Sequence, residues 1–264
     1  KKKKKKKIII IIIIIKMYNI KKFILFGDSI TEKGYEYDQK GWVMSLSEKY
    51  IRKVDVVNRG FSGYNTAHAI GIFPKIFSKE TCKDTLLMTL FFGANDAATN
   101  PEQMVSNEGY AFNMRKLINL CLETFPDNCP VIVITPPPCY SKKFNEGRIV
   151  HDRFNKRTEE FRNLCISTVK EFSNNPRVFY IDIWEDIFGQ TWDAESEEFD
   201  AILDNYVSDG LHLNGNGNDL VYKKLIQLID ENLPHLSSDN MKMNGPYWRD
   251  IDPENVKEAF QDDE

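Results

Sequence analysis

Five short apolar runs, each separated from the next by a longer segment, predict five β-strands. They are rich in Val, Ile, Leu and Phe, and turn-forming residues flank them. Their apolar positions are continuous rather than alternating, which is typical of strands buried on both faces, as in a parallel sheet. The runs cover residues 22–27, 54–58, 85–93, 130–135 and 177–183.

Segments with helical periodicity lie between and after these runs. Apolar residues recur at i, i+3, i+4 and i+7 most clearly over residues 114–125, over residues 154–172 and after Gly217. A further segment after Tyr64 contains Pro74, which we expect to kink or end it. The repeated alternation predicts an α/β fold, in which a five-stranded parallel sheet lies between two helical layers. Right-handed crossovers leave few strand orders, including the flavodoxin-like one.

The two ends of the chain depart from this pattern. Residues 1–16 contain only Lys and Ile, but eight isoleucines are too few to span a bilayer, and no small-residue cleavage site follows. We interpret them as a low-complexity leader, with a secretory or membrane-associated role as the alternative. Residues 237–264 form an acidic extension, for which Tyr247 and Trp248 are candidate anchors. Residues 17–236 then form a single domain.

Charge and cysteine content exclude several functions. The leader holds eight of the 35 Lys and Arg residues, so residues 17–264 carry 27 basic against 39 acidic residues, a net charge of −12. Such a negative body disfavours nucleic acid or an anionic membrane as a partner. The five cysteines show no CxxC spacing, which is typical of a reduced intracellular protein without disulfides or a zinc site. We therefore expect a cytoplasmic protein.

Ser29 is the first residue with two competing interpretations. It follows the first predicted strand in the segment FGDSITE, and ligands of parallel sheets bind beyond the carboxyl ends of strands. A serine here can be a nucleophile, or it can cap a helix, with Glu32 three residues later completing a capping box. Taken alone, the motif favours the helix cap.

His212 is the candidate general base. Asp209 precedes it by three residues, and Gly210 between them permits a tight turn. One loop can therefore direct the carboxylate at the imidazole Nδ1–H, which fixes the tautomer and stabilises the imidazolium. An ordinary surface turn is the alternative for an isolated Asp-x-x-His.

Candidate oxyanion donors follow the second and third predicted strands. The amide of Asn95 can reach the crevice, or it can form an Asx turn. Gly60 and Gly63 either serve a turn that needs positive φ or expose a backbone N–H to a ligand. Taken alone, each of these sites favours a local structural role at least as much as a catalytic one. Together, four sites at ligand-facing positions supply a nucleophile, a base, its orienting group and donors, which favours catalysis.

Four segments resemble, in order, the sequence blocks of the GDSL or SGNH hydrolases: FGDSITE, NRGFSGYNT, FFGANDA and DGLHLNGNG. The similarity covers residue 23 to about residue 230. It is greatest to the isoamyl-acetate-hydrolysing esterase branch, through NRGFSGYNT, TPPP and DGLHLNGNG. Ile30 stands where the family name has leucine, a volume-conserving change. The resemblance implies the SGNH hydrolase fold, a flavodoxin-like three-layer α/β/α arrangement.

The resemblance also implies roles for individual residues. Ser29 would be the nucleophile of a triad with Asp209 and His212, and the oxyanion hole would comprise the Ser29 N–H, the Gly63 N–H and the Asn95 side chain. The implied activity is that of a serine esterase acting on small acetate-type esters through an acyl-enzyme, with no metal or organic cofactor. Acyl transfer, lipase or thioesterase activity, and non-catalytic ligand binding are the alternatives.

Aromatic residues in or near the ligand-facing loops are candidates for an apolar substrate pocket, although core packing is the alternative for several. They are Trp42, Phe61, Tyr64, Tyr140 and Phe144. The expected partner is a small ester. Stable membrane insertion is not expected, and a homodimer is left open.

Overall fold

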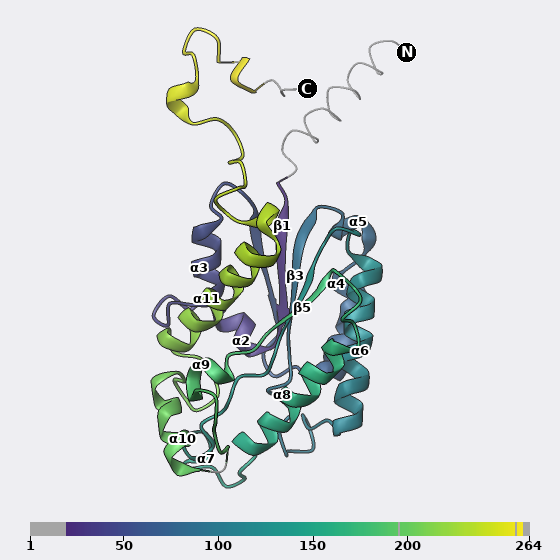
Figure 1. The fold of residues 1–264 in the computed structure, drawn as a ribbon, viewed down its shortest axis with the longest axis vertical. Coiled ribbons are helices and arrows are strands. Elements are labelled where there is room, and N and C mark those ends of the chain that lie inside the picture. The colour runs from purple at the N-terminus through teal and green to yellow at the C-terminus, as the bar shows by residue number, and fades with distance from the viewer. Residues whose placement is uncertain (1–19, 195, 257, 261–264) are drawn as a thin grey trace.

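The computed structural model describes residues 20–194, 196–256 and 258–260, and helices cover both faces of its single sheet (Figure 1). The predicted leader, residues 1–16, lies outside the described residues. The five strands are all parallel, in the order β2-β1-β3-β4-β5. This is a flavodoxin-like order, so the predicted α/β architecture is confirmed.

The strands coincide with the five apolar runs, with small shifts at their ends. They are β1 (Lys22–Gly27), β2 (Asp55–Gly60), β3 (Thr85–Phe91), β4 (Val131–Ile134) and β5 (Val178–Ile181). The three central strands are buried along nearly their whole length, whereas β2 and β5 are largely half-buried. Burial on both faces therefore holds for the centre of the sheet and not for its edges, where each strand has a neighbour on one side only.

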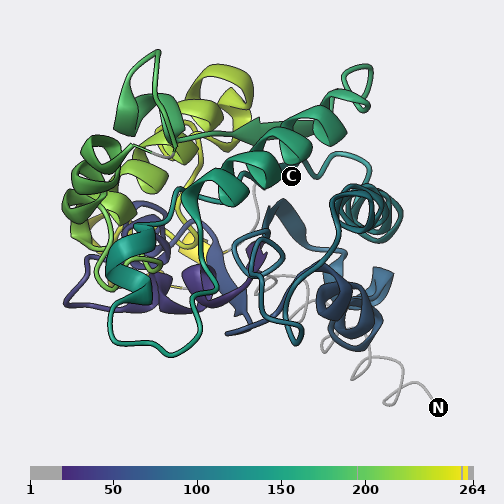
Figure 2. The same cartoon turned by 90° about the horizontal axis from the view of Figure 1, so that it is seen from below.

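Side chains of the central strands alternate between two hydrophobic cores. On β1, Phe23 and Leu25 enter one core, while Ile24 and Phe26 enter the other. The first core includes residues of α3 (Trp42–Lys49) and α11 (Gly215–Asn232), and the second includes residues of α4 (Thr66–Ile76), α6 (Asn107–Thr124) and α8 (Asn155–Lys170). Figure 2 looks along the molecule from below and shows these helices on the two sides of the sheet.

The long helices confirm the three periodic segments, and most of their apolar positions lie in the cores. Phe154, the N-cap of α8, is an exception and is exposed. In α4 the helix continues two residues beyond Pro74, so the proline lies inside the last turn rather than ending the helix. Among the described residues, we find no helix with the length and apolarity needed to cross a membrane. Short elements complete the chain: α2 (Ser29–Glu32), η1 (Lys33–Tyr35), α5 (Lys79–Cys82), α7 (Ser141–Asn145), α9 (Trp184–Phe188), α10 (Glu197–Ile202), η2 (Leu203–Asn205), η3 (Pro234–Leu236), η4 (Trp248–Asp250) and η5 (Glu258–Phe260).

The C-terminal extension is attached near the amino-terminal ends of the strands (Figure 1). The Arg52 guanidinium, in the turn between α3 and β2, donates to the carbonyl oxygens of residues 244, 245 and 246 at 3.3, 2.9 and 3.0 Å. Tyr247 and Trp248 contact each other and are 45% and 67% exposed. Lys53 adds a second contact, because its Nζ donates to Ser238 Oγ at 2.9 Å. Arg52 and Lys53 therefore attach the extension, rather than the exposed aromatic pair.

Candidate active site

Three of the four predicted segments leave the sheet at one edge, at the carboxyl ends of neighbouring strands. Gly27 at the end of β1 is in register with Gly60 of β2 and Phe91 of β3. Backbone hydrogen bonds continue past the strands, because Phe61 N donates to Gly27 O at 2.9 Å and Asp28 N donates to Phe91 O at 3.3 Å. The loops that carry Ser29, Gly63 and Asn95 therefore begin side by side.

The fourth segment brings His212 to Ser29, 183 residues away in the chain. The His212 Nε2 atom lies 2.8 Å from Ser29 Oγ, and its Nδ1 lies 2.7 Å from Asp209 Oδ2. Ser29 is the first residue of α2, directly after β1, and is 7% exposed. A hydrogen-bonded relay therefore runs from a carboxylate through an imidazole to a serine hydroxyl.

A compact turn aims the imidazole. Asp209 Oδ1 accepts hydrogen bonds from the backbone N–H groups of Leu211 and His212 at 3.0 and 2.8 Å, so one carboxylate fixes both the turn and the ring. Gly210 has φ of +92°, and a Cβ there would lie 2.5 Å from the backbone nitrogen of Phe144 in α7. The turn therefore needs glycine for its conformation and for its close packing on α7.

Hydrogen bonding keeps Asp209 ionised. Burial alone would raise the pKa of this carboxyl, but the hydrogen bonds from the His212 ring and from backbone N–H groups outweigh burial and hold the pKa well below its usual range. The carboxylate is thus negatively charged beside the imidazole at neutral pH, as an orienting group requires.

The helix-cap interpretation of Ser29 is wrong. The N-cap of α2 is Asp28, whose Oδ1 accepts from Ile30 N at 2.9 Å. Glu32 does not complete a capping box, because its Oε2 accepts from Ser62 N at 2.8 Å and so ties α2 to the loop after β2. With the cap supplied by its neighbour, the Ser29 hydroxyl is available for its hydrogen bond with His212.

Asn95 and Gly63 lie on adjoining loops. The Asn95 Nδ2 donates to Tyr64 O at 3.0 Å, and its Oδ1 accepts from two other side chains, so its side chain does not form the Asx turn. Gly63 has φ of +79°, which meets the turn interpretation of this residue. Over the part of the chain that the structure describes, the N–H groups of Ser29 and Gly63 donate to no protein acceptor. Both stay available to an incoming oxygen.

The candidate pocket residues separate into three groups. Trp42 is a correction, because its side chain is 0% exposed in the core and its Nε1 donates to Ile30 O at 3.2 Å. Phe144 is also buried against the core. Phe61 and Tyr64 stack with ring centroids 5.1 Å apart, and Tyr64 lines a surface hollow with Gly63.

Tyr140 is half-buried and lines a different hollow, between α7 and α10. Phe61 and Tyr64 are therefore the candidate pocket residues that lie beside a predicted oxyanion donor.

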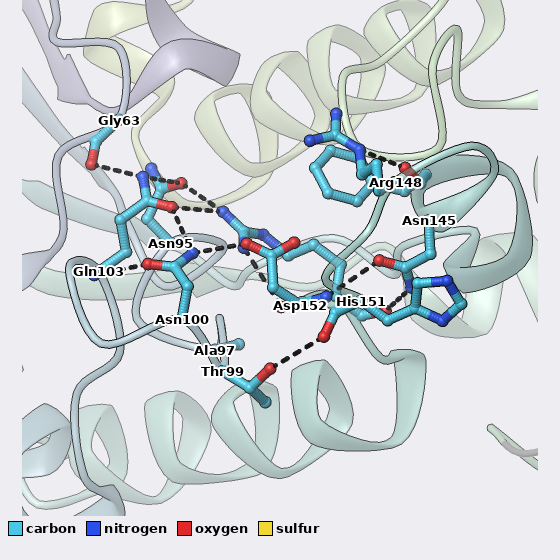
Figure 3. A network of polar contacts seen from close by, with 12 residues as sticks. Gly63, Asn95, Ala97, Thr99, Asn100, Gln103, Asn145, Arg148, His151 and Asp152 are labelled. Atoms are coloured by element: carbon cyan, nitrogen blue, oxygen red, sulfur yellow. Dashed lines mark hydrogen bonds and ion pairs between the residues drawn. The ribbon is translucent and has the colours of Figure 1, made fainter.

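Two side chains behind Asn95 were not singled out by the sequence. Arg153 and Gln103 both donate to Asn95 Oδ1, each at 3.2 Å. Figure 3 shows Gln103 beside Asn95. Arg153 lies in the irregular loop between α7 and α8, and Gln103 lies in the loop after β3. Neither follows a strand directly, so the rule of inspecting strand ends does not reach them. No local sequence pattern marks Arg153 or Gln103, because their contacts with Asn95 form only in the tertiary fold.

Comparison with known proteins places the chain among ester hydrolases. Residues 25–220 match the model of the GDSL-like lipase/acylhydrolase family. The isoamyl acetate-hydrolyzing esterase 1 homolog of Homo sapiens is 35% identical over 239 residues, which cover 87% of this chain and 88% of that protein. The isoamyl acetate-hydrolyzing esterase of Saccharomyces cerevisiae is 27% identical, with 88% and 95% covered.

A solved structure agrees on the fold. The lipase/acylhydrolase from Enterococcus faecalis aligns with a TM-score of 0.59 and 22% identity, covering 85% of this chain and 98% of that one. Fold and relatives together define a carboxylic ester hydrolase. Within that class, the chain belongs to the GDSL-like lipase/acylhydrolase family, which confirms the resemblance seen in the four sequence segments.

Proposed function

We propose that the protein is a serine esterase that hydrolyses small acetate-type esters through an acyl-enzyme intermediate. The relay carries this proposal: Asp209 Oδ2 is 2.7 Å from His212 Nδ1, and His212 Nε2 is 2.8 Å from Ser29 Oγ. Both distances are within the range over which a positioned base takes a proton from a nucleophile.

Acylation begins when Ser29 Oγ attacks the ester carbonyl carbon and His212 Nε2 takes the hydroxyl proton. Asp209 holds the ring and stabilises the imidazolium. The carbonyl oxygen becomes an oxyanion, and the donors available to it are the Ser29 N–H, the Gly63 N–H and the Asn95 Nδ2. The intermediate collapses when His212 protonates the leaving alcohol, which leaves the acyl group on Ser29.

Deacylation repeats these steps with water. His212 takes a proton from the water as its oxygen attacks the acyl carbon, and the same donors stabilise the second oxyanion. His212 then returns the proton to Ser29 Oγ, and the carboxylic acid leaves. Asp209, His212 and Ser29 complete this cycle, together with the oxyanion donors.

Preference for a small ester is supported from two sides. The human and yeast relatives are named for hydrolysis of isoamyl acetate. In this chain, the stacked rings of Phe61 and Tyr64 are the apolar surface beside Gly63. An alkyl group of a short ester can pack there without a long acyl channel.

The cytoplasm is the compartment that we favour. All five cysteines are free and buried, as in a protein that matures under reducing conditions. A membrane substrate is disfavoured by the negative charge of residues 17–264.

Comparison of the wild type with Ser29→Ala on an activated acetate ester tests the proposal. We expect wild-type hydrolysis to exceed that of the variant by at least about 10³-fold, because the variant cannot form the acyl-enzyme. Equal rates would support a non-catalytic binding protein. Products formed with a competing alcohol separate hydrolysis from acyl transfer, since exclusive transfer with no free acid would contradict the esterase proposal.

A further inference from the structure

Arg153 is a buried cation with an unusual set of partners. It is 3% exposed, and burial of a guanidinium is costly unless its N–H groups are paired. Its Nη1 donates to the carboxylate and the carbonyl of Asp152 at 2.8 and 3.2 Å, which supplies a counter-charge. Its Nη2 donates to Gln103 Oε1 at 2.9 Å and to Asn95 Oδ1 at 3.2 Å. One end of this cation therefore faces an amide of the proposed oxyanion hole.

Gln103 extends the contact to the second loop. Its Nε2 donates to Asn95 Oδ1 at 3.2 Å and to Gly63 O at 3.0 Å, as Figure 3 shows. Its Oε1 accepts from Arg153 and from Asn100, so its orientation is fixed as well. Two of the three proposed oxyanion donors, Gly63 and Asn95, are thus connected through one side chain that Arg153 holds.

This network fixes which way the Asn95 amide points. An amide can flip at little cost where its surroundings are symmetrical, but here two donors face Oδ1. A flipped amide would direct its NH₂ group at the N–H groups of Arg153 and Gln103, so both hydrogen bonds to Asn95 would be lost, and it would place its oxygen against Tyr64 O. Nδ2 therefore faces the opposite way, toward Tyr64 O and the site. Donors on Oδ1, one of them charged, also polarise the amide and strengthen its N–H groups as donors.

The loop that carries Arg153 is itself held firmly. Asn145 of α7 donates to Arg153 O at 2.7 Å and accepts from Asp152 N at 3.0 Å. Thr99 N donates to Asp152 O at 3.1 Å. The Thr99 hydroxyl also donates to His151 O at 3.4 Å, and these contacts join this loop to the one after β3 (Figure 3). Arg153 is therefore presented from a fixed backbone, as a side chain that sets another's orientation must be.

The geometry points to Arg153 as a positioning residue for the oxyanion hole, acting through the Asn95 amide both directly and by way of Gln103. This inference rests on the proposed esterase function. Arg153 touches neither the nucleophile nor the base, and its effect is on stabilisation of the oxyanion rather than on proton transfer. Its loss should therefore lower kcat and leave KM for a small ester nearly unchanged.

A double-mutant cycle tests the inference. Loss of one oxyanion donor costs about 10²–10³ in kcat, so we expect Arg153→Met to lower kcat by about 10- to 100-fold with KM within about threefold. In an Asn95→Ala background the same substitution should cost less than about threefold, because the group it positions is gone. Equal losses in both backgrounds, or an unchanged kcat in the first, would overturn the inference.

Two further variants keep the result interpretable. Arg162→Met is the matched control, since Arg162 of α8 is also largely buried and paired with a carboxylate, that of Asp182, but contacts neither Asn95 nor Gln103. We expect it to lower stability without lowering kcat. If Arg153→Met does not fold, Arg153→Lys retains the charge beside Asp152 and repeats the cycle, with a smaller loss that should again vanish in the Asn95→Ala background. Wild-type turnover above that of Ser29→Ala is established first, so failure of the esterase proposal is recognised separately.

Discussion

Asp28 and Ser29, the two residues that follow β1, have different roles, although the sequence allowed either role for Ser29. Asp28 caps α2, which leaves Ser29 free to hydrogen-bond with His212. Aspartate and serine are both good N-caps, so the local sequence cannot say which of the two takes the role. The choice depends on His212, whose approach from residue 212 is a property of the whole fold.

Asp28 also predicts a pH dependence of stability. Burial raises the pKa of this carboxyl from 3.8 to about 7. Between these two pH values the folded protein retains a proton that the unfolded chain has released, so the stabilisation falls as pH rises through this window and is lost above it.

Asp28→Asn preserves an acceptor for the helix cap but cannot titrate. We expect the free energy of unfolding of the variant, minus that of the wild type, to be larger at pH 8 than at pH 5 by about 1 kcal/mol or more. Urea unfolding at both pH values measures this difference. A difference that does not change with pH would contradict the burial of an ionisable Asp28.

At the scale of elements, α7 supports two parts of the site. Its Phe144 backbone packs against Gly210 in the turn that holds His212, and its Asn145 fixes the backbone of Arg153. The sequence patterns predicted neither α7 nor this double contact. Short helices in irregular regions are set by tertiary contacts, which periodicity does not report.

Substitution of Gly210 tests this support. A Cβ at this position would lie 2.5 Å from Phe144 N, and φ is +92°, so Gly210→Ala must displace the turn. We expect kcat to fall by about tenfold or more, because small displacements of a catalytic group are costly.

Gly147→Ala is the matched control for this experiment. Gly147 also has positive φ, at +72°, but a Cβ there would meet no atom within 4 Å. It should cost about 1 kcal/mol of stability from backbone strain, with kcat unchanged. Equal effects of the two substitutions on kcat would show that the packing of α7 on the turn does not position His212.

On the scale of the molecule, sequence patterns predicted the strands of the sheet better than the ends of those strands or the packing of single side chains. Continuous apolar runs identified all five strands, since the central ones are buried on both faces. The exact ends of the strands were not predicted, because they depend on backbone hydrogen bonds and not on where the apolar residues stop. Trp42 was assigned to a pocket because it lies near a loop, but it fills the core, where its ring contacts Phe91 of β3. Burial of a single aromatic residue depends on packing that a linear pattern does not contain.

The candidate site was predictable to the extent that its residues follow strands or lie in matched segments. Ser29, Gly63 and Asn95 meet that condition, and Asp209 with His212 has a recognisable spacing. Arg153 does not, because the loop that bears it takes its course from contacts with Thr99 and Asn145. Positioning residues such as Arg153 are thus the part of this site that could be found only from the structure.

The central claim is that the fold makes Ser29 the nucleophile by bringing His212 to it. Peptide mapping after treatment with a serine-directed phosphonate measures this most directly. We predict one adduct per chain, on Ser29, absent from Ser29→Ala and formed much more slowly in His212→Ala. An adduct on another residue, or labelling of Ser29 at the same rate without His212, would contradict the account.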